Sequence, residues 1–339
     1  MIERSREPTA ASRVLDGLVA LVSKVGLAAI LIVVLVALFG LLEPRFFNRL
    51  NLINILRNSS FLMIAATGQM LVLIVGGFDL SVGAVAALAS VVAASAMAGL
   101  LITMPEATGS VIALGVLAGL MAGAAVGLVN GLCVAFLKVS PFMVTLGTLS
   151  IASGIALYHT TGIPVYGMPD AFTKGFGRAI VFGLPLIAFF AVATVLAVWF
   201  VQARTKFGRY LYAIGGNLQA ARVSGVPTQF TLIAAYVLCS LLAAGTGVLL
   251  TARVGSGQAT IGSTLMLESI AAAVIGGVSL RGGIGRVELV ALAALFLSIV
   301  TNGMNLIRID SKMQTVVLGV VLILAVATER AIEMRKRRG

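Results

Sequence analysis

The sequence predicts an all-α, polytopic membrane protein with about ten transmembrane helices. Of its 339 residues, 60% are hydrophobic and 11% are charged, whereas an ordinary soluble domain carries about 25% charged residues. Uncharged apolar runs recur along the chain, and crossing a hydrocarbon core of roughly 30 Å takes about 20 apolar residues in a helix. The formal net charge of +12 comes largely from basic residues that flank these runs, which indicates membrane topology rather than nucleic-acid binding.

The chain divides into a basic N-terminal segment 1–24, a membrane domain 25–329 and a basic tail 330–339. The first apolar run ends at Glu43 and Pro44 and lacks the short apolar region and cleavage site of a signal peptide, so we expect a retained helix. Helices are expected at 25–42, 60–78, 80–103, 109–137, 142–158, 179–202, 229–251, 263–280, 287–307 and 313–329.

The distribution of charge orients these helices. With ten spans and the N-terminus in the cytoplasm, both termini are cytoplasmic, and most of the 24 Lys and Arg residues fall on that side. An excess of Lys and Arg on the cytoplasmic side is what the positive-inside rule requires. The longest polar connections are then 160–178 outside and 202–229 inside.

Two regions interrupt the pattern. The segment 43–60 is expected to be an interfacial amphipathic stretch whose apolar side chains face lipid. They are Phe46, Phe47, Leu50, Leu52, Ile53 and Leu56. In 254–288, Glu268 and several glycines break the hydrophobicity, so a re-entrant or broken helix stays open beside a continuous one.

A faint internal repeat accompanies these spans. GGFDLSVG at 76–83 matches GGVSLRGG at 276–283, an offset of 200, whereas Asn130 and Gly131 match Asn302 and Gly303 at an offset of 172. Repeated halves are common in transporters, where the substrate path runs between them. Because the two offsets differ and the chain has 38 glycines, duplication and chance both stay open.

The connection 203–228 predicts a short helix outside the bilayer. Asn217 is a start signal, the following residues are helix formers, and Gly225 before Pro227 is a stop signal. A helix at about 218–224 is marginal alone in water and would be stabilised by docking against another surface. The alternative is a loop that merely joins two spans.

Several motifs in order resemble a known family. GRYLYAIGGNLQAARVSGV at 208–226, with the two glycine motifs above and the ending from NGMNLIRI onward, resembles the membrane permease subunits of bacterial ABC importers for sugars, the ribose/xylose/galactose branch. The resemblance runs from about residue 46 to 327. The QAA triplet at 219–221 with Gly225 resembles the EAA-x3-G core of importer permeases, although Gln219 replaces the acidic residue and the usual Ile-x-Leu-Pro tail is absent.

The resemblance implies a homodimeric permease in the bacterial inner membrane that imports a monosaccharide, a ribose-like pentose or a hexose. It also implies a periplasmic sugar-binding protein outside and an ABC ATPase inside, whose groove receives the loop. The residues expected to couple to the ATPase are Arg209, Gly216, Asn217, Ala220, Ala221 and Gly225. The chain itself has no G-x4-GK[ST] phosphate-binding loop, so we expect no cofactor in it and ATP-Mg on the partner.

Polar residues inside the apolar runs are candidates for the translocation path. Asp79 either lines that path or, with Ser81, caps the helix that follows by accepting backbone N–H groups. Glu268 either pairs with Arg253 or Arg281 or contacts cargo. Amides can both donate to and accept from sugar hydroxyls, and interhelical bonding is their alternative role. These amides are Gln69, Asn130, Asn302, Asn305 and Gln314.

Other residue types point to structure rather than chemistry. Cys133 and Cys239 lie far apart without metal-ligand spacing, and His159 is the sole histidine, so we expect neither a metal site nor a catalytic site. Glycines at 119, 123, 127 and 131 form a small face suited to close helix packing or to a dimer seam. The competing function is an ion-coupled secondary transporter using Asp79 or Glu268; a membrane enzyme and a channel are weaker alternatives. The sequence does not specify the sugar.

Overall fold

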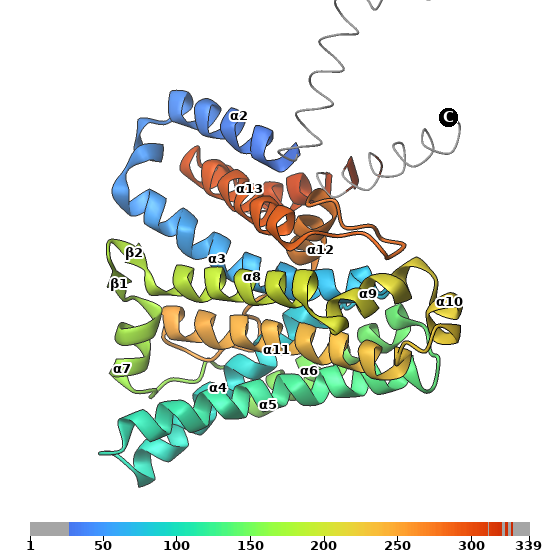
Figure 1. Ribbon diagram of the computed structural model, residues 1–339. Coiled ribbons are helices and arrows are strands. Elements are labelled where there is room, and N and C mark those ends of the chain that lie inside the picture. The colour runs from blue at the N-terminus through green and yellow to red at the C-terminus, as the bar shows by residue number, and fades with distance from the viewer. Residues whose placement is uncertain (1–26, 311, 321–322, 325–326, 328–339) are drawn as a thin grey trace, which may run out of the picture.

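The computed structural model describes residues 27–310, 312–320, 323–324 and 327, which form a bundle of long helices (Figure 1). Six helices of the described part are long and apolar enough to cross a membrane by length and composition. They are α4 (Val82–Thr103), α5 (Thr108–Ala135), α6 (Pro141–Thr160), α8 (Leu186–Arg204), α11 (Thr228–Val254) and α13 (Val287–Leu306). With the shorter apolar helices α2 (Leu27–Leu42) and α12 (Leu265–Ile275), they confirm a helical polytopic membrane protein.

The remaining elements are α3 and several short pieces. α3 (Arg49–Ile74) has 26 residues, but its first turns are polar. The short elements are η1 (Pro44–Phe47), α7 (Asp170–Phe172), η2 (Thr173–Gly177), β1 (Ile180–Val181), β2 (Leu184–Pro185), α9 (Lys206–Gly216) and α10 (Leu218–Val223). The antiparallel pair β1–β2 lies where the expected 179–202 helix was placed to begin, so that helix starts later, at Leu186.

α3 is the central helix of one half of the bundle. It packs against α8, α11, α12 and α13, and nearly every side chain from Phe61 to Ile74 is buried. Asn48 caps its start by accepting the Leu50 amide at 3.0 Å. The expected helix at 60–78 therefore begins eleven residues earlier, because a cap and tertiary packing extend it through a polar stretch that hydropathy had excluded.

The lipid-facing interpretation of 43–60 is wrong for part of the segment. Phe46 and Ile53 are buried, and Phe46 packs with Phe39 of α2 and Ile299 of α13. Leu50, Leu52 and Phe47 are exposed as expected. The segment is thus the turn and first part of α3, with one side folded onto the neighbouring helices.

α4, α5 and α6 form the other half, and α11 bridges the two halves (Figure 1). The glycine face of α5 lies against this bridge: a Cβ at Gly119 would meet Val248, and one at Gly127 would meet Ser240. These glycines pack helices of the same chain, so the face does not supply a dimer seam. α6 touches α4 and α5, and most of its surface stays exposed.

α12 is a broken span. It has 11 residues, and irregular backbone precedes it and follows it, which confirms the interrupted alternative for 254–288 and shortens the expected 263–280 helix. The two glycine motifs close their preceding helices in the same way: Gly77 donates to the Val72 carbonyl and Val278 to the Ala273 carbonyl, with positive φ at Gly76 and Gly277. The shared turn therefore recurs at an offset of 201, one residue from the sequence match.

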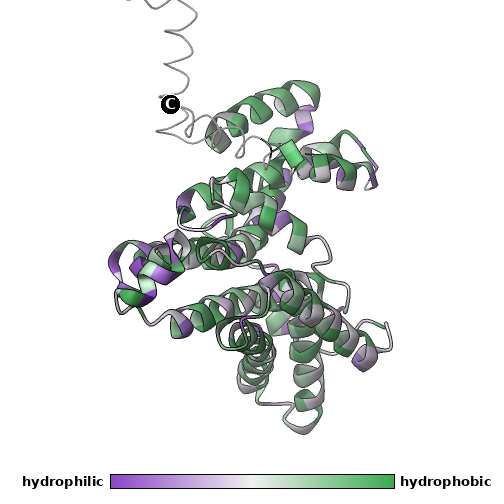
Figure 2. Ribbon diagram, turned by 90° about the vertical axis from the view of Figure 1, so that its right-hand side faces the viewer, coloured by the Kyte–Doolittle hydropathy of each residue, from purple (hydrophilic) through white to green (hydrophobic). Residues whose placement is uncertain are grey.

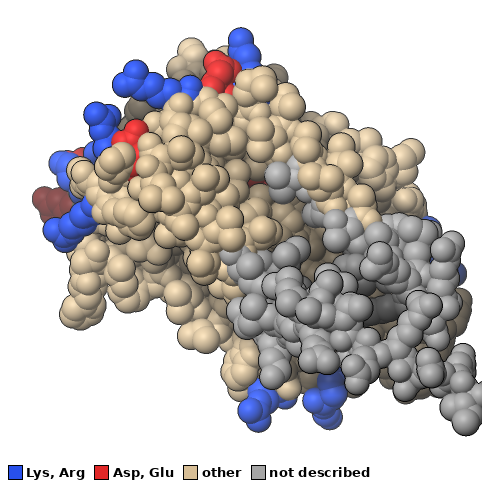
Figure 3. All heavy atoms as spheres, turned by 90° about the horizontal axis from the view of Figure 1, so that it is seen from above, with Lys and Arg blue, Asp and Glu red and all other residues tan. Residues whose placement is uncertain are grey.

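The bundle has two distinct ends. α9 and α10 lie at one end, and α7 with β1–β2 lies at the other (Figure 1). Viewed onto the first end, hydrophilic residues gather on the short helices while the long helices are mostly apolar (Figure 2). Figure 3 shows charged side chains mainly at the margins of an otherwise uncharged face. Residues 312–320, 323–324 and 327 belong to the last expected helix. Its other residues, segment 1–24 and tail 330–339 lie outside the described residues.

Candidate functional site

α9 and α10 build an exposed knuckle at one end of the bundle. Thr205 caps α9 by accepting the Gly208 amide at 3.1 Å, and Asn217 caps α10 by accepting the Ala220 amide at 3.0 Å. α10 therefore starts and ends where the sequence predicted. The helix α9 before it was not predicted. It is a short amphipathic helix, with Leu211 and Ile214 on its buried face, and it lacks the long apolar run of a membrane span.

The expected coupling residues lie on this knuckle, with one difference among them. Ala221 is buried against the rest of the chain, whereas its neighbours in α10 are exposed. Val223 is 90% exposed. Gly225 has φ +79 and open space around it, so it ends α10 in a conformation that suits glycine. The exposed members of the set are Arg209, Gly216, Asn217, Ala220 and Gly225.

Gly215, which the sequence analysis did not single out, anchors the knuckle to the bundle. A Cβ there would overlap the carbonyl oxygen of Ile74, at the end of α3, and the amide of Gly283. Gly283 itself donates to the Ile74 carbonyl at 2.8 Å. By contrast, nothing lies within 4 Å of a Cβ at Gly216. Gly215, and not Gly216, is therefore the glycine that allows α9 to approach the end of α3 and Gly283 closely.

Gln202 and Tyr212 make a second attachment. The Tyr212 hydroxyl donates to the Gly285 carbonyl at 2.6 Å, and the Gln202 amide donates both to that carbonyl, at 3.2 Å, and to the Tyr212 oxygen. The Val287 amide donates to Gln202 Oε1 at 3.3 Å. Burial, and then the charge of Glu288, raise the pKa of Tyr212 above its ordinary value, so the hydroxyl stays protonated and able to donate.

Asp79 begins a buried chain of hydrogen bonds. Its Oδ1 accepts the amide of Ser81 at 2.8 Å and the hydroxyl of Ser81 at 2.5 Å. Asn130 donates to the Ser81 hydroxyl at 3.1 Å, and Thr148 donates to Asn130 at 2.7 Å. The chain joins the start of α4 to α5 and α6. It unites three expected residues with Thr148. Asp79 accepts the amide of Ser81, just before α4, but no side chain caps the first turn of α4 itself, so the capping alternative is met only in part.

The other amides are placed differently. Asn302 exchanges two hydrogen bonds with Asn51, at 2.8 and 3.0 Å, and ties α13 to α3. Asn305 accepts from Gln314 at 2.8 Å. Gln69 is fully buried in α3, and neither of its amide atoms has a hydrogen-bond partner among the described residues. Asn302 and Asn305 thus make the interhelical bonds that were the alternative role, and their place on a path stays a prediction.

Glu268 does not make the expected ion pair. Its hydrogen-bond partner is Thr264, and the ion pairs between described residues involve other carboxylates. Glu268 lies instead on a cavity of about 260 Å³ between α3, α11, α12 and α13. Its polar lining is Asn58, Thr264, Glu268, Ser298 and Thr301.

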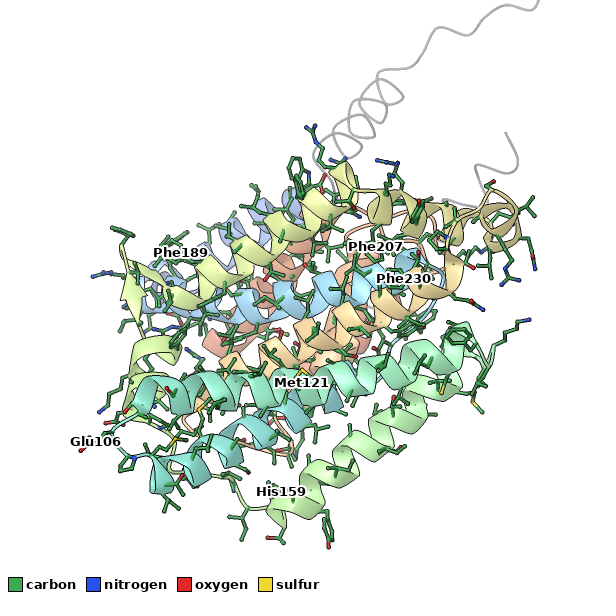
Figure 4. The ribbon with its side chains drawn as sticks, turned by 60° about the horizontal axis from the view of Figure 1, so that its bottom comes forward. Glu106, Met121, His159, Phe189, Phe207 and Phe230 are labelled. Atoms are coloured by element: carbon green, nitrogen blue, oxygen red, sulfur yellow. The ribbon has the colours of Figure 1, made fainter. Side chains whose placement is uncertain are left out.

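A crevice of about 270 Å³ opens between α4, α6 and the irregular segment before α12. Ser153 on α6 and the hydroxyls of Thr260 and Ser263 supply its polar groups. Figure 4 shows α6 at the edge of the bundle, with His159 at the end of that helix. His159 Nε2 lies 3.0 Å from the Ser95 hydroxyl and is exposed, which leaves it outside the crevice.

Three arginines converge from separate elements at the end that carries α7. Arg57 of α3 donates to the backbone carbonyl of Arg178 at 3.3 Å, and the charges of both act on Arg253 at the end of α11. The Nε of Arg57 is buried and has no partner among the described residues. The ion pairs between described residues do not include these three cations. Sequence spacing provided no signal for this cluster, because its members are 75 or more positions apart.

Comparison with known proteins gives a consistent set of matches. The family model described as "Branched-chain amino acid transport system / permease component" matches residues 51–326. The ribose import permease protein RbsC of Escherichia coli K12 is 38% identical over 308 residues, which cover 88% of this chain and 92% of RbsC. No solved structure matches the chain.

Two further relatives from Escherichia coli K12 cover similar shares. The galactose/methyl galactoside import permease protein MglC is 37% identical, over 91% of this chain and 94% of MglC. The D-allose transport system permease protein AlsC is 34% identical, over 89% of this chain and 90% of AlsC. The helical membrane bundle and these full-length matches agree with the resemblance that the motifs indicated. The chain belongs to this family of transport-system permease components, which are transport subunits and not enzymes.

Proposed function

We propose that the chain is the permease subunit of an ATP-driven ABC importer for a monosaccharide, a ribose-like pentose or a hexose. The observation that carries the proposal is the near full-length similarity to permeases named for ribose, allose and galactose. The family model's description names branched-chain amino acids. The names of the relatives favour a sugar as the transported substrate. Leucine, a branched-chain amino acid, is therefore the control substrate that we expect not to be transported.

We place the knuckle of α9 and α10 in the cytoplasm, against an ABC ATPase that holds ATP-Mg. In this orientation both termini are cytoplasmic, and the ten spans are the nine long or interrupted helices plus the one that starts at residue 312. The protein would lie in the inner membrane of a bacterium. The exposed apolar Val223 and the open surface around Gly225 suit a docking surface better than a simple connection between spans.

We place a periplasmic sugar-binding protein at the opposite end. Arg57, Arg178 and Arg253 repel one another there, and no carboxylate of the described residues forms an ion pair with them. A surface of this kind favours acidic groups of a partner, because complementary charge speeds encounter and orients docking.

We further propose a homodimer whose path lies at or near the subunit interface, on the side of α6. Hydroxyls such as those of Ser153 and Thr260 on an open crevice suit a polar path better than lipid, since polar groups facing hydrocarbon are costly. A second copy facing this crevice would enclose it. The chain would then alternate between outward and inward access while the ATPase supplies the energy.

The deciding experiment is a pull-down of the tagged chain from its native membrane in detergent, with mass spectrometry of the copurified proteins. We expect an ATPase with Walker motifs, together with ATP-driven uptake of ribose, allose or galactose by the reconstituted complex. Uptake of leucine alone would overturn the sugar assignment. Reproducible absence of an ATPase, with uptake driven by an ion gradient, would overturn the importer and favour the secondary transporter.

Replacing Gly225 with valine is expected to abolish ATP-driven uptake while the protein remains folded and inserted. The backbone at φ +79 costs a β-branched residue about 1–2 kcal/mol, and the open space leaves that strain in α10 and not in the core. His159→Ala, at an exposed site, is the control and should transport normally. Uptake that survives Gly225→Val would show that α10 is not the coupling helix.

Arg253→Glu is expected to weaken stimulation of the ATPase by the binding protein about tenfold, equivalent to about 1.4 kcal/mol of lost association free energy. The variant places an acid beside Arg57 and Arg178 and lowers the formal charge of the three-residue cluster from +3 to +1. Titration of the binding protein against ATPase activity measures the effect at low salt. Arg45→Glu, which alters an exposed arginine beside Glu43, is the matched control. Equal loss in both variants would contradict a specific docking role for the cluster.

A further inference from the structure

The segment 279–286 joins α12 to α13 and touches the knuckle at two places. At the first, Gly283 donates to the Ile74 carbonyl, and Gly215 of α9 is packed against both groups. At the second, Gly285 accepts from Tyr212 of α9 and from Gln202 near the end of α8. Both contacts use backbone atoms of the segment, so α9 holds its main chain and not only flexible side chains.

Gln202 can hold segment 279–286 and the start of α13 together because both the nitrogen and the oxygen of its side-chain amide form hydrogen bonds there. Its nitrogen donates to the Gly285 carbonyl while its oxygen accepts the Val287 amide, the first amide of α13. An amide can do this since it carries a donor and an acceptor a short distance apart. The side chain is 9% exposed, so water competes little for these bonds.

Segment 279–286 lies between two helices that line the same internal cavity. On one side of 279–286 lies α12, whose Glu268 lines the cavity between α3, α11, α12 and α13. On the other side α13 supplies Ser298 and Thr301 to the same cavity. α10, in contrast, packs against α9 and α11. α9 is therefore the element that connects α10 to segment 279–286.

We propose that Gln202 of α8 and Tyr212 of α9 are positioning residues that lock α9 to segment 279–286 and the start of α13, so that movement of the ATPase-docking knuckle is passed to α12 and α13. This role rests on the proposed function, because it needs an ATPase that moves α9 and α10. Coupling between distant sites requires a contiguous set of packed and hydrogen-bonded groups. Gln202, Tyr212 and the Gly285 carbonyl provide such a set.

The test is hydrogen–deuterium exchange on the complex copurified with its ATPase, without nucleotide and after trapping with ATP and vanadate. In the wild type we expect exchange to change in peptides covering 206–225 and in peptides covering 279–290. In Tyr212→Phe and Gln202→Leu, the change in 206–225 should persist and the change in 279–290 should be lost. Tyr210→Phe is the control. It removes, from the same helix, a hydroxyl group that makes no hydrogen bond with a described residue, and it should behave as wild type.

The possible results of this experiment distinguish failure of the proposed lock from failure of the proposed function. A normal response of 279–290 in Tyr212→Phe would overturn the lock and leave ATPase docking intact. No response of 206–225 in the wild type would overturn both, because the knuckle would then not be where the ATPase acts. If Gln202→Leu fails to fold, Tyr212→Phe, which removes one oxygen, still decides. Loss of thermal stability alone, with the response of 279–290 retained, would assign the two residues a merely structural role and overturn the lock.

Discussion

Replacing Gly215 with alanine is expected to lower the free energy of unfolding by about 3 kcal/mol, the upper part of the range for overpacking a close contact. The added Cβ would overlap the Ile74 carbonyl and the Gly283 amide, which are backbone groups and cannot rotate away. The end of α3, the end of α9 and segment 279–286 would have to separate. Thermal unfolding of the purified protein in detergent measures the loss, and ATP-driven uptake should fall with it.

Gly216 provides the matched control on the adjacent position. Nothing lies within 4 Å of its Cβ, and its φ is not in the left-handed region, so Gly216→Ala should leave stability unchanged or raise it by up to about 1 kcal/mol. Equal destabilisation by the two substitutions would contradict the specific packing at Gly215. A stable Gly215→Ala variant would show that the knuckle does not hold the end of α3.

Replacing Asp79 with alanine is expected to lower the free energy of unfolding by about 2 kcal/mol, since a buried donor left without its acceptor costs about 1–3 kcal/mol. The Ser81 amide and hydroxyl both lose their acceptor, and the chain to Asn130 and Thr148 loses its fixed end. Asp170→Ala, at an exposed ion pair with Lys174, should cost less than about 1 kcal/mol. Thermal unfolding of both variants measures the difference.

Asp79→Asn separates structure from ion coupling. Asparagine keeps an oxygen that can accept from Ser81, so the variant should fold and should retain ATP-driven uptake. A secondary transporter that carries protons through Asp79 would lose uptake, because an amide does not titrate. Loss of uptake in a well-folded Asp79→Asn protein would therefore contradict a purely structural carboxylate and favour the ion-coupled alternative.

Local features explain what was predicted correctly. Hydropathy identified the helices α4, α5 and α11 to within a few residues, because each is long and apolar throughout. The start signal at Asn217 and the glycine at 225 placed α10, since caps and left-handed turns are satisfied by residues next to them in the chain. The interruption near Glu268 was also visible as a loss of apolar character.

Elements that depend on distant partners were placed less well. α3 starts at Arg49 although its first turns are polar, because Phe46 just before it and Ile55 within it pack with Phe39 of α2 and Ile299 of α13. Asn302 exchanges hydrogen bonds with Asn51, 251 positions away, and the sequence provided no signal for this pairing. Hydropathy cannot see either effect, since both depend on which helices lie side by side.

From the sequence alone it could be predicted that the chain is a helical membrane protein, which family it resembles and where the short helix α10 lies. These properties follow from composition, from motifs and from short-range hydrogen bonds. Only the tertiary structure decided that Gly215 and not Gly216 is the packed glycine, that three arginines share one surface, and that Gln202 and Tyr212 meet Gly285. The physical reason is that these contacts join backbone and side-chain atoms from segments far apart in the chain, whose proximity is created by packing and not by local sequence.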